Sequence, residues 1–430
     1  MVETAGVKLW LKRESELSKL MSEYSTEQQD VFERHYIEIC LAQGYRSLVA
    51  GGRLEPTQDP PHLFAYYNAA VAKGFHETLN ATGKTKHAGR IRQALRQTYG
   101  FAALLTEYRL WTTGLELNCD VVPIDFNELG NFDFLWLQEE DALEIECKVL
   151  TQDYAATVNR SSFNRLGRVL ESELRRLLLP GTSQILFLDL EEDLPRRDTD
   201  LAALANFIFE FVAGAPASPP NYVRALRKED FAAGHADPSL AHSEARFITL
   251  LHGHYTLAFH NEQAGVVVAI SGPPVSAERF SARLLRKLKE AADQLSGQRP
   301  GALFFETEGP SPDRPVNLAF QKRVEGVATQ LFAQRPHLDL VILGFAGPPF
   351  SAGRTHAIPN RRRKRKNRSV LSLKLERFMN APPIAASAVN LFRDFQTDWW
   401  RHKYRWEHKS QRDVAKAALD YRKRREPGSG

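Results

Sequence analysis

The chain contains little cysteine and no long apolar run. Its 430 residues include three cysteines, Cys40, Cys119 and Cys147. This small, odd number at wide spacing excludes a disulfide framework and a cysteine-rich zinc site, and it favours a reducing, cytoplasmic location. No apolar stretch approaches the ~20 residues of a transmembrane helix, and residues 1–17 lack the apolar segment of a secretory signal. We therefore expect a cytoplasmic protein with no membrane partner.

The net charge of +5 is small, but it is unevenly distributed along the chain. The last 80 residues contain 21 Lys and Arg against 7 Asp and Glu, which is a net charge of +14. The preceding 350 residues therefore carry a net charge of −9. This asymmetry is typical of an acidic, enzyme-like body with a basic tail, and a polyanion is the natural partner of such a tail.

The pattern of apolar residues predicts an α/β protein with four regions. Apolar positions recur at helical spacing in residues 14–43 and 63–79, which predicts a helical N-terminal region over 1–86. Residues 87–195 are predicted to form a core. Its elements are a helix (87–113), three strands (115–122, 132–137, 142–150), a helix (162–179) and a strand (184–190).

The third and fourth regions follow a proline-rich segment at 215–221. Alternating strands and helices predict a second α/β region over 220–350. Whether its strands extend the first sheet is left open. Residues 351–427 form a basic, Trp-rich C-terminal arm.

The segment 131–150 carries the residues with the clearest chemical use. In the predicted strand 142–150, side chains alternate, so Glu144, Glu146 and Lys148 share one face. A short hairpin turn centred at residues 139–140 would place Asp133 across from Glu146. Two carboxylates and an amine would then converge on one side of a sheet.

Such a group is suited to cutting a phosphodiester bond. Carboxylate oxygens are the ligands that Mg²⁺ and Mn²⁺ prefer, so Asp133 and Glu146 can hold either ion. The bound metal acidifies a water molecule and screens the scissile phosphate. The amine of Lys148 can orient that water or stabilise the charge that develops on the phosphate.

Asp133 together with Glu146-Cys147-Lys148 resembles the bipartite motif of the PD-(D/E)XK nuclease superfamily. The resemblance implies a restriction-endonuclease-like core of helix, three-stranded meander, helix and strand, the order predicted over residues 87–190. It implies that Asp133, Glu146 and Lys148 are catalytic. It further implies a Mg²⁺ or Mn²⁺ site whose ligands are Asp133, Glu146 and the Cys147 carbonyl, supported by Glu107 on the preceding helix. The chain departs from the motif at Phe132, where many members have proline.

Other readings of these residues remain open. Glu-x-Lys alone is a weak motif. It recurs at Glu407-His408-Lys409, in a Trp-rich segment that is predicted to be helical and lacks strand alternation. The acids and the lysine of the first copy could instead form cross-strand ion pairs on a solvated face. Asp120 could join the site from the first strand, but a structural acid at a strand end is favoured. His252 and His254 share a strand face, yet no third ligand at useful spacing supports a metal site.

The arm contains two groups of candidate nucleic-acid-binding residues. The first is a dense basic run: Arg361, Arg362, Arg363, Lys364, Arg365, Lys366 and Arg368. The second interleaves Arg401, Lys403 and Arg405 with tryptophans and a tyrosine. Cations and aromatics together can grip phosphates and stack on unpaired bases. A solvated loop and a helix that docks its tryptophans onto the body are the alternatives.

The sequence thus predicts a metal-dependent endonuclease. DNA is favoured over RNA because most enzymes of this resemblance cut DNA. Cores of this kind with long additional regions are typical of restriction or phage-defence effectors, so a homo-oligomer or a partner protein of a defence system is compatible with the prediction. The alternative is a catalytically inactive, nuclease-like subunit that binds nucleic acid or serves as a scaffold in a larger complex.

Overall fold

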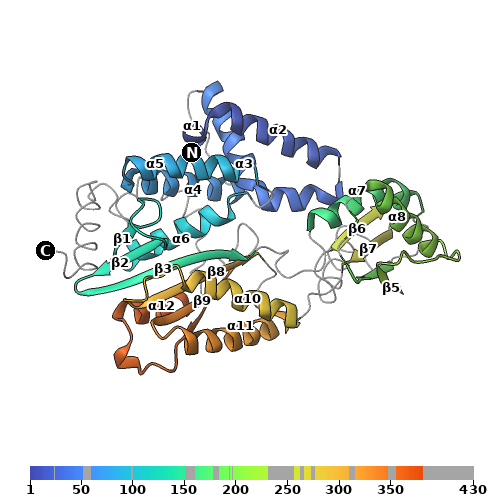
Figure 1. Cartoon of the computed structure of the whole chain (residues 1–430). Coiled ribbons are helices and arrows are strands. Elements are labelled where there is room, and N and C mark those ends of the chain that lie inside the picture. Colours follow the sequence, from blue (N-terminus) through green and yellow to red (C-terminus); the bar gives the residue numbers. More distant parts are fainter. Residues whose placement is uncertain are drawn as a thin grey trace. The chain divides into compact units, whose positions relative to one another are not determined.

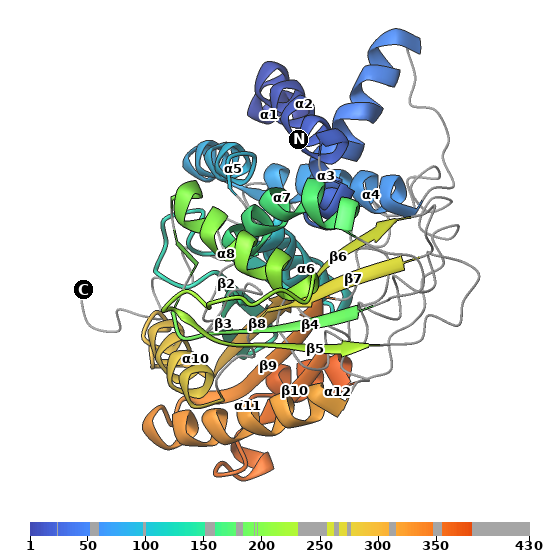
Figure 2. The same ribbon diagram turned by 90° about the vertical axis from the view of Figure 1, so that its right-hand side faces the viewer.

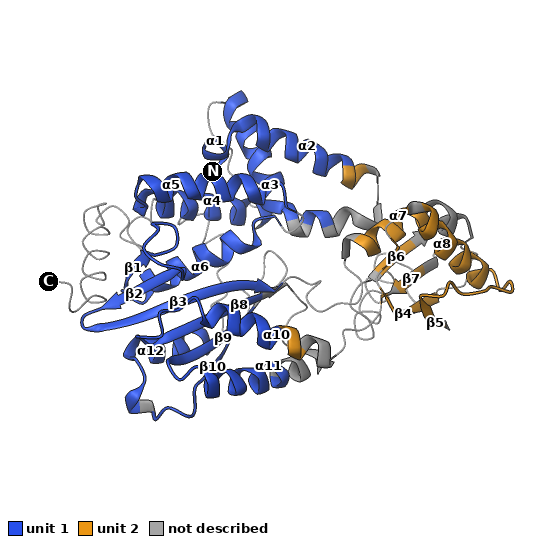
Figure 3. Ribbon diagram, in the orientation of Figure 1, with its two compact units in different colours: residues 1–19, 31–151, 284–430 blue, residues 20–30, 152–283 orange. Residues whose placement is uncertain are grey.

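The chain divides into two units, each with its own sheet (Figure 3). The first unit comprises Met1–Lys19, Val31–Thr151 and Leu284–Gly430, and the second comprises Leu20–Asp30 and Gln152–Arg283. The computed structural model describes residues 1–23, 25–51, 60–97, 100–150, 160–177, 184–192, 194–195, 197–230, 256–261, 266–272, 277–308, 315–346 and 355–380.

The sheet of the first unit has six strands in the order β1-β2-β3-β8-β9-β10. Strands β1 (Asp120–Pro123), β2 (Phe134–Gln138) and β3 (Asp141–Leu150) form an antiparallel meander. Strands β8 (Gly301–Glu308) and β9 (Leu338–Ala346) continue the sheet parallel to β3. Strand β10 (Thr355–Pro359) closes the other edge, antiparallel to β9.

Helices cover both faces of this sheet (Figure 1). On one side lie α4 (Pro60–Thr78), α5 (Ala81–Ala94) and α6 (Ala102–Glu116), and on the other lie α10 (Ala277–Ala292) and α11 (Pro315–Gln334). Short α1 (Val2–Ala5), α2 (Val7–Glu23) and α3 (Ser25–Gly51) add buried side chains to the α6 side, including Trp10 and Ile37. Helix α12 (Val370–Asn380) contributes Leu371 and Leu375 to the same cluster.

The second unit contains a four-stranded sheet of order β5-β4-β7-β6, whose strands lie side by side in Figure 2. These strands are β4 (Gln184–Leu190), β5 (Val223–Asp230), β6 (Thr256–Asn261) and β7 (Val266–Ser271). Helices α7 (Arg160–Leu177) and α8 (Asp198–Val212) share a hydrophobic cluster with them, built around Phe163, Leu188 and Ile208.

The predicted core therefore differs from the observed one after β3. The strand at 184–190 forms as expected, but it pairs with β5 and β7 rather than with the meander. In its place, β8 pairs with β3 over Glu144–Leu150, and α10 precedes it. The order helix, three strands, helix, strand is thus made by α6, β1–β3, α10 and β8, with most of the second unit inserted between β3 and α10.

The predicted helix over 87–113 is two helices. Gly100, between α5 and α6, has φ +51°, a conformation that favours glycine and interrupts the helix. The second helix continues past Gly114, the predicted stop, to Glu116. A Cβ atom on Gly114 would lie 2.4 Å from Val121 Cγ2 and 2.9 Å from the Trp136 ring. Glycine at this position therefore allows α6 to approach β1 and β2 closely.

The predicted arm over 351–427 is also corrected by the structure. Its first part, residues 355–380, belongs to the first unit as β10, a short 3₁₀ helix η1 (Arg365–Asn367) and α12. The remainder, residues 381–430, lies outside the described residues. Within the described part of the chain, no helix combines the length and the apolar character that a membrane span requires.

A buried acid at the start of β9 fixes the basic run. Asp339 is fully buried and accepts hydrogen bonds from Arg363 Nη1 (2.6 Å), the Ser369 N–H (2.8 Å) and Ser372 Oγ (2.9 Å). The last two donors belong to the start of α12, so one carboxylate ties this helix and the preceding loop to the sheet. Arg368 pairs in turn with Glu376 of α12 at 2.7 Å.

We expect Asp339→Ala to lower the free energy of unfolding of the first unit by about 3–5 kcal/mol, because it leaves buried donors unpaired. Urea denaturation followed by circular dichroism measures this change. The control is Asp293→Ala, because Asp293 is 57% exposed in its pair with Arg335 and should contribute less than about 1 kcal/mol. Equal effects of the two substitutions would show that Asp339 has no special structural role.

Candidate metal centre

The hairpin of β2 and β3 places the two predicted acidic ligands opposite each other. Gln138 pairs with Asp141, so the turn is Glu139-Glu140, as predicted. Phe134 pairs with Ile145, and Asp133, which immediately precedes β2, therefore lies opposite Glu146. The Asp133 N–H donates to Glu146 Oε2 at 3.2 Å. The register needed for a shared site is thus present.

Strand β3 extends past the first residue of β2, where Asp133 lies. Backbone groups of β3 therefore face Asp133 instead of a β2 partner. The Asp133 carbonyl accepts from the Ile124 N–H at 2.8 Å, on the side of β1. The Cys147 N–H donates to Asp133 Oδ2 at 2.7 Å, where a longer β2 would have offered a carbonyl. Since the N–H and C=O of one strand residue point to the same edge, the Cys147 carbonyl faces this edge too.

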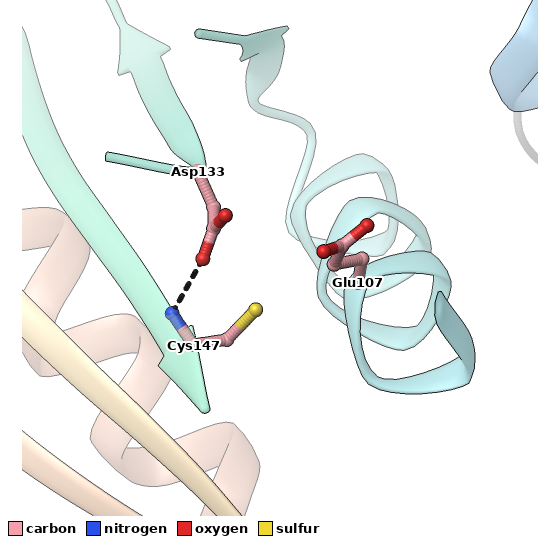
Figure 4. Close-up of side chains that lie close together, drawn as sticks. All are labelled: Glu107, Asp133 and Cys147. Atoms are coloured by element: carbon pink, nitrogen blue, oxygen red, sulfur yellow. Dashed lines mark hydrogen bonds between the residues drawn. The ribbon is translucent and has the colours of Figure 1, made fainter. Parts of the chain in front are cut away.

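Glu107 joins the two strands from α6. Its Oε1 accepts from Arg90 Nη1 at 2.5 Å, while its Oε2 is buried and has no hydrogen-bond partner in the described part of the chain. One oxygen each of Glu107 and Asp133 and the sulfur of Cys147 all lie within 4.8 Å of one another (Figure 4). The predicted supporting glutamate is therefore at the site.

Lys148 lies on the opposite face of β3 from the Cys147 side chain. Its Nζ hydrogen-bonds to Glu146 Oε1 and donates to Gln294 Oε1 at 3.1 Å. Gln294 follows α10 and has no local sequence signal, because 146 residues separate it from Lys148. Glu144, on the same face, is held by Ser296, whose N–H and hydroxyl donate at 2.7 and 2.5 Å. Glu144 therefore has a structural role.

Two further residues near the site escaped the sequence analysis. Arg90 of α5 forms a second ion pair with Asp125, the residue two after β1, and lies 4.3 Å from the ring centre of Phe126. Lys86, one helical turn before Arg90, donates to Asp125 Oδ1 at 2.7 Å. The four-residue spacing of these cations was the available signal, but the sequence does not show which acid they face.

Burial makes the charged forms of the acids unfavourable. Burial is the largest cause that raises the pKa of Glu146 to about 9, and the Asp133 carboxylate adds to it. Burial also raises the pKa of Glu107 to about 8; Arg90 opposes this shift, whereas Asp133 and Asp125 add to it. Burial raises the pKa of the Cys147 thiol, and the carboxylates of Asp133, Glu107 and Glu146 add to this shift. An added cation would reverse the electrostatic part of each shift.

The other candidates separate into three groups. Asp120 is exposed at the start of β1, away from the end that adjoins Asp133, in agreement with a structural strand-end acid. In the basic run, called the basic loop below (residues 361–368), Arg363 and Arg368 have acidic partners. Its exposed cations are Arg361, Arg362, Lys364 and Lys366. The side chain of Arg365, the second basic group (Arg401, Lys403, Arg405), His252, His254 and the second Glu-x-Lys at 407–409 lie outside the described residues.

Comparisons with protein-family models, with curated proteins and with solved structures find no match to this chain. The chemistry of the site therefore rests on the geometry of these residues.

The raised pKa values predict how pH and a divalent cation affect stability. In the unfolded chain the two glutamates titrate near 4.5, so between about pH 5 and pH 8 the folded protein holds more protons. Stability of the metal-free protein therefore falls as pH rises through this range. A bound cation favours the charged carboxylates, so Mg²⁺ should raise the melting temperature more at about pH 8 than at about pH 5.5.

Thermal unfolding with and without Mg²⁺ across this pH range tests the prediction. The matched control is Glu107→Gln, which keeps the size of the side chain and removes one titrating group, so the pH dependence of the Mg²⁺ effect should become weaker. A Mg²⁺ effect of the same size at both pH values would contradict the role given to these acids.

Proposed function

We propose that this chain is a metal-dependent nuclease that hydrolyses phosphodiester bonds, with DNA favoured over RNA. The observation that carries the proposal is the pairing of Asp133 with Glu146 at the end of β2. Lys148 lies beside Glu146. Glu107, whose buried Oε2 has no hydrogen-bond partner among the described residues, has one oxygen within 4.8 Å of an Asp133 oxygen. These are the groups that phosphodiester hydrolysis requires.

The donor set fits a hard divalent cation. Mg²⁺ and Mn²⁺ bind carboxylate and carbonyl oxygens. The carboxylates of Asp133 and Glu146 and the carbonyl of Cys147 would hold the ion, and one oxygen of Glu107 lies within 4.8 Å of Asp133. When bound, such an ion acidifies a water molecule and offsets the charge of the scissile phosphate.

Lys148 is positioned to act on the phosphate. Its ammonium group is held between Glu146 and Gln294, which restricts the conformations of a long and flexible side chain. A fixed ammonium next to the acids stabilises negative charge that develops on the phosphate oxygens. Arg90 serves the same site differently, because it holds Glu107 through Oε1 and leaves Oε2 toward the strands.

The order of elements in the first unit supports the resemblance to PD-(D/E)XK nucleases. Helix α6 carries Glu107, and the meander β1–β3 carries the motif residues. Helix α10 and strand β8 then follow, and β8 is parallel to β3. The DNA preference and a place among restriction or phage-defence effectors rest on this resemblance alone.

The exposed cations of the basic loop are close enough to serve the same nucleic acid. Arg363, within the loop, pairs with Asp339 at the start of β9. Gly301 of β8 pairs with Leu338 of β9 on one side and with Glu144 on the other, so the loop adjoins the Glu144 end of β3. Two strand spacings amount to about 10 Å, less than one turn of a duplex.

The test of the proposal is a cleavage assay. We expect the protein to cut at least one of plasmid, linear duplex, single-stranded DNA and RNA in Mg²⁺ or Mn²⁺, and none in EDTA. Lys148→Ala removes the positive charge next to the phosphate, and Asp133→Asn removes a charged metal ligand, so each should reduce the rate by about 100-fold or more.

The control substitution is Asp120→Asn, which changes an exposed acid on the neighbouring strand and should leave the rate unchanged. Circular dichroism checks that every variant is folded. If wild type cuts no substrate under any condition, or if the variants cut as well as wild type, the nuclease proposal fails. Binding without cleavage would favour the inactive, nuclease-like subunit.

The basic loop predicts a salt-dependent contribution to binding. Four substitutions to Gln are made at the exposed cations Arg361, Arg362, Lys364 and Lys366. Each phosphate contact contributes about 0.9 to the slope of log affinity against log salt on duplex DNA, so the slope should fall by up to about 3–4. Fluorescence anisotropy at several salt concentrations measures it.

The control variant also removes four positive charges, from other exposed sites. These are Lys12, Lys73, Arg286 and Lys287. It should leave the slope nearly unchanged. A truncation that begins before residue 380 is unsuitable, since it removes α12 from the hydrophobic core. An equal loss of slope in both variants would indicate that the loop makes no specific contact.

A further inference from the structure

The side chain of Cys147 gives the candidate metal centre a ligand that Mg²⁺ does not need. Successive side chains of β3 point to opposite faces of the sheet, so Cys147 points away from Lys148 and toward α6. There its sulfur lies within 4.8 Å of one oxygen of Glu107 and one of Asp133 (Figure 4). In the described part of the chain, this is the group of three His, Cys, Asp or Glu side chains whose ligand atoms lie close enough together to hold a metal ion.

We propose that Glu107, Asp133 and the Cys147 thiolate form an inhibitory site for a thiophilic divalent ion such as Zn²⁺ or Cd²⁺. This inference rests on the proposed function, because it gives the same centre a second mode of metal binding. Occupation of the inhibitory site excludes Mg²⁺ from the catalytic one, since both require the carboxylate of Asp133.

Glu107 provides an independent indication of a ligand. Its side chain is 6% exposed, and its Oε2 atom has no hydrogen-bond partner among the described residues. A buried carboxylate oxygen without a hydrogen-bond partner destabilises the folded protein, so such atoms are rare unless a ligand satisfies them. Arg90 holds Oε1 and thereby restricts the orientation of the carboxylate, one oxygen of which lies within 4.8 Å of Asp133 and Cys147.

The distances suit a tetrahedral ion after a small adjustment. Bonds of about 2.3 Å to sulfur and about 2.1 Å to oxygen require ligand atoms about 3.5 Å apart. The three atoms here lie within 4.8 Å of one another, so side-chain rotations that move the ligand atoms by about 1 Å suffice. A water molecule can take the fourth position. Coordination replaces the S–H bond by a metal–sulfur bond and releases one proton to the buffer.

The chemistry of the ligands separates the two modes. Thiolate sulfur binds Zn²⁺ and Cd²⁺ strongly and Mg²⁺ hardly at all. An ion drawn toward the Cys147 sulfur lies on the α6 face of β3, whereas Glu146 and Lys148 point to the other face. The ion is therefore on the other side of β3 from the Lys148 ammonium group, which stabilises charge on the phosphate. We infer that the ion binds there and blocks hydrolysis.

Cadmium provides a direct readout of the sulfur, because Cd–thiolate bonds absorb in the ultraviolet. Full-length protein, kept reduced with a phosphine, is titrated with Cd²⁺ in the absence of nucleic acid. We expect one equivalent to produce the absorption band in wild type and in Cys40→Ala. Cys147→Ala should lack the band. Cys40 is a matched control, since it is buried in the same hydrophobic cluster and belongs to no metal-ligating group among the described residues.

Calorimetry with Zn²⁺ gives the corresponding affinities. Cys147→Ser and Glu107→Gln should each weaken Zn²⁺ binding by at least about 10- to 100-fold, the loss typical of removing a group that supports a metal. Cys147→Ser should weaken Zn²⁺ binding more than Mg²⁺ binding, because it removes the sulfur and keeps the backbone carbonyl. Glu107→Gln keeps the thiol, so its effect reports on the site even if Cys147 variants fold poorly.

The outcomes distinguish this inference from the proposed function. If wild type gives no Cd–thiolate band, or if the band survives Cys147→Ala, the inhibitory site does not exist, and Mg²⁺-dependent cleavage can still occur. If the band behaves as expected but no nucleic acid is cut, the nuclease proposal fails alone. If cleavage occurs, Zn²⁺ should inhibit wild type at concentrations at least about 10-fold lower than those that inhibit Cys147→Ser.

Discussion

The hydrogen bond from the Cys147 N–H to Asp133 Oδ2 determines the arrangement of the candidate metal centre. Strand β2 starts one residue after Asp133, and beyond this point β3 pairs with β8 on one edge but not with β2 on the other. The side chain of Asp133 takes the place of the missing backbone acceptor, so an unpaired strand edge becomes a fixed carboxylate. Its own N–H then reaches Glu146, and the two acids are held together by the backbone rather than by flexible side chains.

Two cations stabilise this group without neutralising it completely. Arg90 binds Glu107 from α5, and Lys148 binds Glu146 from within β3. Three carboxylates therefore share two cations, and Asp133 lies between them. Burial makes the remaining negative charge costly, which is why the pKa values of Glu107 and Glu146 are raised. A divalent cation at this position would be bound strongly, because it removes an electrostatic penalty already present in the folded chain.

The hairpin could be predicted from the sequence because its determinants are local. Alternation of side chains and a two-residue turn fix the register, which places Asp133 opposite Glu146. The sheet to which Gln184–Leu190 belongs is not local information, since a buried apolar strand has the same composition in either sheet. For the same reason, the partners of Arg363 and Lys148 could not be foreseen. Asp339 and Gln294 reach them only through the tertiary fold.

Three buried glutamates near β3 show how a structural acid differs from a candidate ligand. Glu144 and Glu146 are almost fully buried, which argues against a solvated strand face with cross-strand ion pairs. Ser296 donates hydrogen bonds to both oxygens of Glu144, so this carboxylate has a structural role. Glu146 depends on Lys148, and Glu107 keeps one oxygen unpaired among the described residues. Apolar side chains of similar size would stabilise the fold better at these two positions. Acids that cost stability at these positions, beside the carboxylate of Asp133, support the proposal that a metal ion binds here.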